Sequence, residues 1–168
     1  MKPINTKKLV SAFKSTSEKP IHYQPYGGGA GYICNGYMGA VITDHDSWRD
    51  LLLKLGSEAE KGRVKMFVQE NLDEQMHKAM ESATRKALTM GITVTRNSRT
   101  VDLFEVERKI VALDCKYLAP VEDWIRASGS DPLSPIVIEG FGYEAVICPV
   151  HPKTIATQLH RAADLLMV

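Results

Sequence analysis

The chain has 168 residues, 44% hydrophobic and 24% charged, a composition typical of a globular protein with one core. Lys and Arg total 21 against 20 Asp and Glu, so a formal charge of +1 excludes a global attraction to nucleic acid or to an anionic membrane. No apolar run approaches the ~18 residues of a membrane helix, and the N-terminus lacks the apolar segment of a signal peptide. We therefore expect a single cytoplasmic domain over residues 1–168.

The N-terminal part predicts one helix followed by β structure. Asn5 or Thr6 can cap a helix with an apolar face made by Leu9, Val10 and Phe13. Residues 21–24 predict a strand, and the glycine-rich residues 25–31 a turn. Residues 32–43 predict a second β stretch, in which Asn35-Gly36 is either a two-residue hairpin turn or a bulge in one long strand.

From Asp44 the apolar pattern changes to a helical period, which predicts a helical pair over residues 45–91. The first helix is expected to end at Gly56, and Ser57 with Glu60 matches a capping box that opens a second, long helix. Its apolar stripe comprises Val64, Val68, Leu72, Met76, Met80, Ala83 and Ala87, and Gly91 would end it. Core packing is the simpler interpretation of this stripe. The alternative is a partner-binding face, with Val68, Leu72, Met76 and Met80 as the contacts.

The second half predicts strands at residues 92–95, 101–104 and 109–113, with a turn at 97–100. A short helical face follows, formed by Tyr117, Leu118, Val121 and Ile125. The clearest local signal is a β-hairpin within residues 134–152, where two β-branched runs flank Gly140 and Gly142. Pro152 suits the first turn of a last helix over residues 152–167. The sequence shows no internal repeat.

No set of residues has the spacing of a catalytic or metal site. The glycines of residues 25–31 lack the Gly-Lys-Ser/Thr that ends a phosphate-binding loop. Cys148 and His151 could form half of a metal site, but the other half is missing. We therefore expect no metal, no cofactor and no small-molecule substrate. Cys34, Cys115 and Cys148 all lie in apolar or strand-like runs and are expected to be reduced core residues, so a small enzyme using Cys34, Cys115 or His45 is a minor alternative.

Three segments are similar to a domain of the bacterial sliding clamp, the β subunit of the replicative DNA polymerase. Residues 109–124 (KIVALDCKYLAPVEDW) and 134–150 (SPIVIEGFGYEAVICPV) resemble the closing portion of such a domain. Residues 31–41 (GYICNGYMGAV) resemble an earlier clamp strand and turn, and the first helix falls where a clamp domain has its own. The resemblance covers residues 4–43 and 100–150. It implies an α+β domain with an antiparallel sheet, a clamp-like helix–strand core and an inserted helical pair.

The resemblance implies a non-enzymatic binding module in DNA replication, DNA repair or the biology of a mobile element. Clamps touch the DNA backbone through basic residues on inner helices and receive short peptide motifs in an apolar cleft. The corresponding candidates for duplex DNA contact are Lys7, Lys8 and Lys14, for which a solvated helix face is the simpler interpretation. A clamp chain has three such domains, so a single domain would need self-association or a protein partner. The alternative is a regulatory or inhibitor-type protein that oligomerises or docks a partner through residues 64–87.

Overall fold

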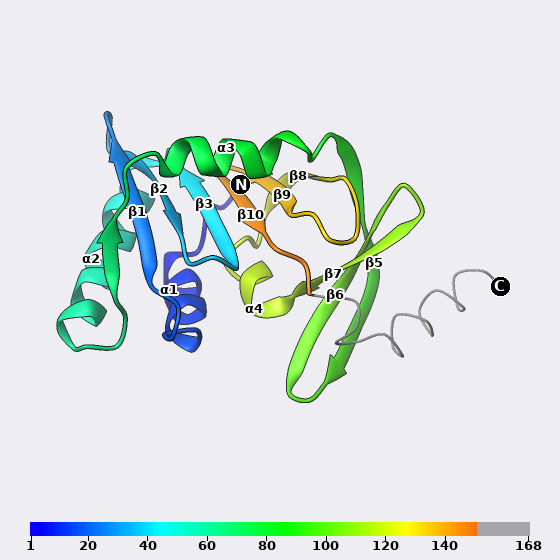
Figure 1. Cartoon of the computed structure of the whole chain (residues 1–168), viewed down its shortest axis with the longest axis horizontal. Helices are drawn as coiled ribbons and strands as arrows, with labels where there is room; N and C mark the ends of the chain where they lie inside the picture. Colours follow the sequence, from blue (N-terminus) through cyan, green and yellow to red (C-terminus); the bar gives the residue numbers. More distant parts are fainter. Residues whose placement is uncertain (151–168) are drawn as a thin grey trace.

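The computed structural model describes residues 1–150, and the helix predicted over residues 152–167 lies outside the described residues (Figure 1). Residues 1–150 form an α+β domain with four helices and ten strands, which confirms the expected fold class. None of the helices in this part of the chain is both long and apolar enough to cross a membrane.

The first half contains α1 (Thr6–Ser15), β1 (Ile21–Tyr26), β2 (Ala30–Cys34), β3 (Met38–Ile42), α2 (His45–Glu60), β4 (Met66–Val68) and α3 (Leu72–Glu81). The second half contains β5 (Arg85–Arg96), β6 (Arg99–Val106), β7 (Lys109–Asp114), α4 (Cys115–Leu118), β8 (Trp124–Gly129), β9 (Ile136–Gly140) and β10 (Tyr143–Ile147). The helix predicted after Asn5 and the hairpin predicted around Gly140 and Gly142 are both confirmed.

The strands form one sheet in the order β4-β1-β2-β3-β10-β9-β8-β5-β6-β7. Only the β4–β1 pair is parallel, and the other neighbouring strands run antiparallel. Figure 1 shows β5, β6 and β7 as a three-stranded arm at the opposite end of the molecule from α2. Because β2 and β3 pair as neighbours, Asn35-Gly36 belongs to a hairpin turn, and the alternative of a bulge in one long strand is wrong.

The centre of the sheet has an internal structural repeat that inspection of the sequence missed. A helix followed by a three-stranded meander occurs twice, as α1-β1-β2-β3 and as α4-β8-β9-β10, and the two last strands pair with each other. Both helices begin with an Asx cap. The Asn5 side chain accepts a hydrogen bond from the Lys8 backbone amide, and the Asp114 side chain accepts one from the Lys116 backbone amide. The strand order β1-β2-β3-β10-β9-β8 is therefore symmetric about the β3–β10 pair.

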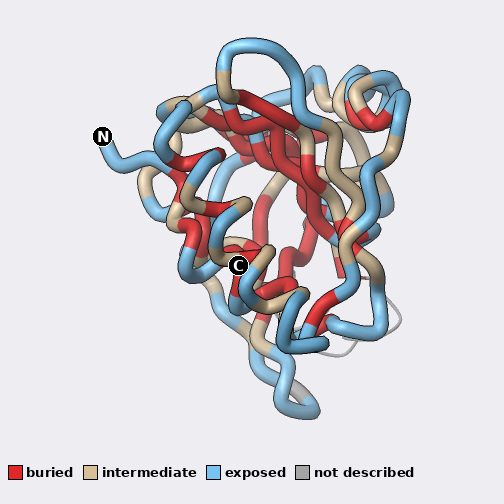
Figure 2. The backbone as a smooth tube through the Cα atoms, turned by 90° about the vertical axis from the view of Figure 1, so that its left-hand side faces the viewer, coloured by how far each residue is buried: buried red, intermediate tan, exposed pale blue. Residues whose placement is uncertain are grey.

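Two apolar layers cover the central strands. On one face α1 and α2 bury large side chains, including Leu9, Phe13, Leu51 and Leu55, against alternate residues of β3, β9 and β10. On the other face Leu72 and Met76 of α3 pack on the intervening residues, such as Val41 and Val146. Figure 1 shows α3 lying across the central strands, apart from α1 and α2. Figure 2 shows that the buried backbone is concentrated in the middle of the molecule.

The long second helix predicted for residues 57–91 was wrong. Gly56 lies inside α2, which continues to Glu60. The chain then forms β4, α3 and the start of β5, where Ala87 pairs with Val106 of β6. Gly91 lies inside β5 with φ of 69°, between Thr89 and Thr93, where the register with β6 shifts. After α2, residues 72–81 therefore form the only part of the predicted helix that is helical. Residues from Ala87 onward lie in a strand, because they pair with β6.

The helical face predicted from Tyr117 to Ile125 was also wrong beyond its first turn. The helix α4 has four residues and ends at Leu118, and β8 begins at Trp124. Ile125 is 58% exposed in β8, so it does not share a buried face with Tyr117. Pro120 lies between the two elements, and its carbonyl accepts a hydrogen bond from the Asn5 amide at 2.8 Å. A proline two residues after α4 is consistent with an early end of the helix.

Candidate protein-binding pocket

A mostly apolar pocket of about 210 Å³ opens between α3 and the sheet. Its lining comes from α3, from the β2–β3 hairpin, from β10 and from the residues just before β9 and just after β10. The lining residues are Cys34, Gly36, Met38, Gly39, Leu72, Gln75, Met76, Ala79, Pro135, Val146 and Cys148. Segments that are far apart in sequence therefore share one concave surface.

Gly39 gives the pocket its floor. It lies in β3 opposite Cys34 of β2 on one side and opposite Val146 of β10 on the other. A Cβ atom at Gly39 would lie 3.0 Å from the Met76 Cε and 3.4 Å from the Cys34 Cβ. The missing side chain therefore allows the Met76 methyl group to approach the sheet closely.

The start of α3 is held to the sheet by a side-chain amide. Asn71 precedes the helix in the left-handed region, with φ of 65°, and its side chain makes no capping hydrogen bond. Instead the Asp73 amide donates to Gln24 Oε1 of β1 at 2.8 Å. This bond satisfies one of the free amides at the helix start and fixes the helix over the strands.

The four residues predicted to bind a partner do not all lie at the same site in the structure. Leu72 and Met76 line the pocket and are only 3% and 5% exposed, so both also serve the core. Met80 is half-buried one turn further along and packs on the same apolar cluster. Val68 lies in β4, is 64% exposed and is not part of this pocket. The pocket residues that the sequence analysis missed, such as Gly39 and Val146, come from strands that pair across the sheet.

Two thiols lie at the Gly36 end of the pocket. The Gly36 amide donates to Cys34 Sγ at 3.2 Å, and Cys148 Sγ donates to the Gly36 carbonyl at 3.7 Å. Burial raises the pKa of both thiols, and Cys34 raises the pKa of Cys148 further. Burial and the nearby Asp102 raise the pKa of Cys115 to about 11. Thiols with raised pKa values are poor nucleophiles at neutral pH.

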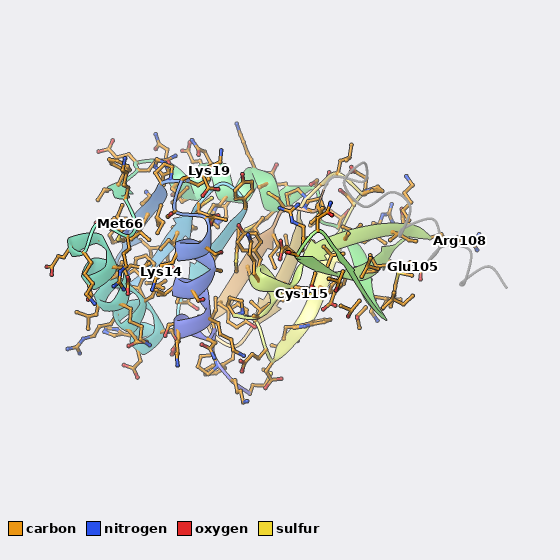
Figure 3. The ribbon with its side chains drawn as sticks, turned by 90° about the horizontal axis from the view of Figure 1, so that it is seen from below. Lys14, Lys19, Met66, Glu105, Arg108 and Cys115 are labelled. Atoms are coloured by element: carbon orange, nitrogen blue, oxygen red, sulfur yellow. The ribbon has the colours of Figure 1, made fainter. Side chains whose placement is uncertain are left out.

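The three lysines predicted to contact DNA lie on α1, but glutamates neutralise two of them. Lys8 Nζ forms an ion pair and hydrogen bond with Glu122, and Lys14 Nζ lies 3.5 Å from Glu58 Oε2. Lys7 lies beside a shallow hollow that Lys14 and Glu58 also line. Figure 3 shows Lys14 on α1. The helix therefore presents less free positive charge than its sequence suggests.

A second hollow, of about 390 Å³, lies between the end of α1 and the start of α4. It is lined by charged and aromatic residues, but these pair with one another. Arg99 Nε lies 3.3 Å from Asp114 Oδ2, and Lys116 Nζ lies 5.2 Å from the centre of the Tyr117 ring. Asp114 also caps α4. Arg99, Asp114 and Lys116 are therefore held in contacts with neighbouring residues, so the apolar pocket is the stronger candidate for a partner.

Comparison of the chain with models of known protein families, with curated proteins and with solved structures finds no match. The clamp resemblance therefore depends on the three sequence segments alone. Within residues 1–150 no three His, Cys, Asp or Glu side chains gather into a set that could hold a metal ion. The pocket beneath α3 is characterised by its shape, its mostly apolar lining and the two thiols at its Gly36 end.

Proposed function

We propose that the protein is a non-enzymatic binding module that receives an apolar side chain of a partner peptide in the pocket beneath α3. The observation that carries this proposal is the half-enclosed apolar volume of about 210 Å³ between α3, β3 and β10. A cavity of about 150 Å³ is large enough to bind benzene, so this pocket has room for one Leu or Phe side chain.

The clamp resemblance supports a particular class of partner. Clamps receive short peptide motifs of polymerases and repair proteins in an apolar cleft, so we propose that this module acts in the cytoplasm in replication, repair or the biology of a mobile element. Burying one large apolar side chain contributes only about 1.5–3 kcal/mol. Flanking residues of the peptide must therefore supply the rest of the affinity, which gives a weak, exchangeable interaction.

Fluorescence anisotropy with labelled clamp-binding peptides tests this proposal. Ala79→Leu fills the pocket from α3, where Ala79 is half-buried, and is expected to weaken binding at least tenfold. Lys78→Leu, at an exposed position of the same helix, is the matched control and should leave the affinity unchanged. Failure of every such peptide to bind the unaltered protein, or equal binding by Ala79→Leu, would overturn the proposal.

Contact with duplex DNA through Lys7, Lys8 and Lys14 stays a secondary part of the proposal. Pairing of Lys8 with Glu122 and of Lys14 with Glu58 predicts that any such binding is weak, with a shallow salt dependence because few phosphates would be neutralised. The oligomeric mass measured with and without duplex DNA distinguishes the alternatives. A ring that forms on DNA supports a clamp-like role, whereas a DNA-independent dimer supports the regulatory interaction protein.

A further inference from the structure

Four sulfur-bearing side chains line the same pocket. Met38 of β3 packs in the core cluster with α1 and α2, and the other three come from separate elements. Cys34 ends β2, Cys148 follows β10 and Met76 lies on the buried face of α3. The Met76 Cε and the Cys34 Cβ both pack against Gly39, within 3.0 and 3.4 Å of the place where a Cβ would be. The two thiols and the thioether therefore line one pocket, from three different elements.

The peptide group of Gly36 brings the two thiols together. Its amide lies 3.2 Å from Cys34 Sγ, and its carbonyl oxygen lies 3.7 Å from Cys148 Sγ. Gly36 adopts φ of 91°, a left-handed conformation that glycine accepts without strain, and this turn presents its amide and carbonyl to the two sulfurs.

A disulfide does not fit this pair of cysteines. Cys34 lies on β2 and Cys148 follows β10, and β3 runs between these strands. Two strand spacings amount to about 9–10 Å, whereas the Cα atoms of a disulfide lie within about 7 Å. A metal ion spans a wider gap between the two sulfur atoms. Two metal–thiolate bonds of about 2.3 Å hold the sulfurs up to about 4.6 Å apart, whereas a disulfide holds them about 2 Å apart.

We propose that Cys34, Cys148 and Met76 bind one soft monovalent metal ion, with Cu(I) and Ag(I) as the matching chemistry. Thiolate and thioether ligands select soft d¹⁰ ions over harder ones. A structural zinc site takes Cys, His or carboxylate ligands, and a thioether such as that of Met76 is not among them. Within residues 1–150 no third Cys, His, Asp or Glu joins the two thiols in such a set.

Binding exchanges two protons for one metal ion: M⁺ and two thiols give a bis-thiolate complex of charge −1 and two H⁺. The Gly36 amide already donates to Cys34 Sγ, and this bond would stabilise the thiolate that the metal needs. Cys148 loses its own donated bond to the Gly36 carbonyl when it gives up its proton. Because two protons leave, the apparent affinity should rise with pH, by up to about 100-fold per pH unit below the thiol pKa values.

The site does not depend on the peptide-binding proposal, since its test uses the metal alone. The reduced full-length protein is titrated with Ag(I), and the remaining free thiols are counted with a thiol reagent. One equivalent of Ag(I) is expected to protect two of the three cysteines. Protection of one thiol or of none would overturn the proposal.

Variants assign the ligands. Cys34→Ser and Cys148→Ser should each weaken Cu(I) binding at least tenfold in a competition titration with a Cu(I) chelator, and Met76→Leu should weaken it less. Cys115→Ser is the matched control and should bind as the unaltered protein does, because Cys115 does not line this pocket. Figure 3 shows Cys115 at the start of α4. Unchanged affinity in either of the first two variants would overturn the assignment, and circular dichroism establishes that each variant is folded.

Discussion

The side-chain amide of Asn35 donates a 2.9 Å hydrogen bond to the Thr16 hydroxyl, and both residues are buried. The Oδ1 atom of the same amide accepts from the backbone amides of Tyr37 and Met38, at 3.0 Å each. The Thr16 hydroxyl in turn donates to the Ala12 carbonyl of α1 at 3.1 Å. One buried amide therefore joins the β2–β3 turn, which forms the mouth of the apolar pocket, to the C-terminal end of α1.

Asn35→Ala is expected to lower the free energy of unfolding by about 2–4 kcal/mol, because it leaves the backbone amides of Tyr37 and Met38 without partners and removes the hydrogen bond donated to the Thr16 hydroxyl. Thr16→Val keeps the two bonds that Asn35 accepts from the backbone amides and removes the bonds of the Thr16 hydroxyl with Asn35 and with the Ala12 carbonyl, so it should cost less, about 1–2 kcal/mol. Urea denaturation of both variants measures the difference. A loss for Asn35→Ala no larger than that for Thr16→Val would contradict the role assigned to the turn.

The parts of the fold that local patterns determine were predictable. Asn5 followed by apolar residues at helical spacing specifies α1, and the paired glycines Gly140 and Gly142 specify the β9–β10 hairpin. Val68 and Ala87 continued the helical spacing of Leu72 and Met76, yet each pairs in a strand. The partner of Val68 lies in β1, far away in sequence, and Ala87 lies near the open end of the long β5–β6 hairpin, well away from its turn, so local spacing revealed neither pairing.

One wall of the candidate pocket could be predicted from the sequence, and the other could not. Helical periodicity identified Leu72 and Met76 as one face of a helix, and that face does line the pocket. The opposite wall could not be predicted, because Gly39 and Val146 meet only through the pairing of β3 with β10. The duplicated helix-and-meander unit escaped detection for a similar reason, since its two copies share a topology and an Asx cap but little composition.

The ion pair between Lys8 and Glu122 should make stability depend on pH in the acidic range. The hydrogen bond from Lys8, opposed by partial burial, holds the pKa of the Glu122 carboxyl below its usual value of 4.5. A carboxyl with a lowered folded-state pKa stabilises the fold above its unfolded-state pKa, and this stability is lost as the pH falls through the folded-state pKa.

Glu122→Gln should therefore flatten the loss of stability on acidification below about pH 4.5, measured as urea midpoints across the pH range. High salt should shrink the difference, because the pair lies near the surface. Glu60→Gln, at an exposed position of α2, is the control. Identical pH profiles for the unaltered protein and Glu122→Gln would show that the pair contributes nothing.

The hydroxyl of Tyr143 is buried, and within residues 1–150 it makes no hydrogen bond. Burial, with a smaller contribution from Asp123, raises its pKa to about 12 from 10.0. A phenol whose folded-state pKa is raised stabilises the fold below its unfolded-state pKa, and this contribution is lost between about pH 10 and 12 as the pH rises.

Tyr143→Phe should therefore be at least as stable as the unaltered protein at pH 7, and its stability should fall less steeply above pH 10. Thermal unfolding at pH 7 and pH 11 measures both effects, and a less stable variant at pH 7 would reveal a partner for the hydroxyl.

The turn between β6 and β7 uses two residues that rarely adopt its conformation. Glu107 and Arg108 have φ of 49° and 67°, the left-handed values of a two-residue hairpin turn that favours Asn-Gly. Figure 3 shows Arg108 at the far end of this hairpin. Left-handed backbone costs a residue with a side chain about 1–2 kcal/mol, whereas the exposed ion pair of Glu107 with Arg85, at 3.1 Å, contributes less than about 1 kcal/mol.

Glu107→Asn with Arg108→Gly should consequently raise the stability by about 1–2 kcal/mol and the melting temperature by roughly 2–8 °C. Arg85→Ala measures the contribution of the lost ion pair separately, because it breaks the pair and leaves the turn unchanged. Differential scanning calorimetry of the unaltered protein, the turn variant and Arg85→Ala measures the three melting temperatures. These show whether the relieved backbone strain exceeds the contribution of the lost ion pair. A melting temperature that falls in the turn variant by more than it falls in Arg85→Ala would mean that the Glu107 and Arg108 side chains stabilise the hairpin by more than their backbone strain costs.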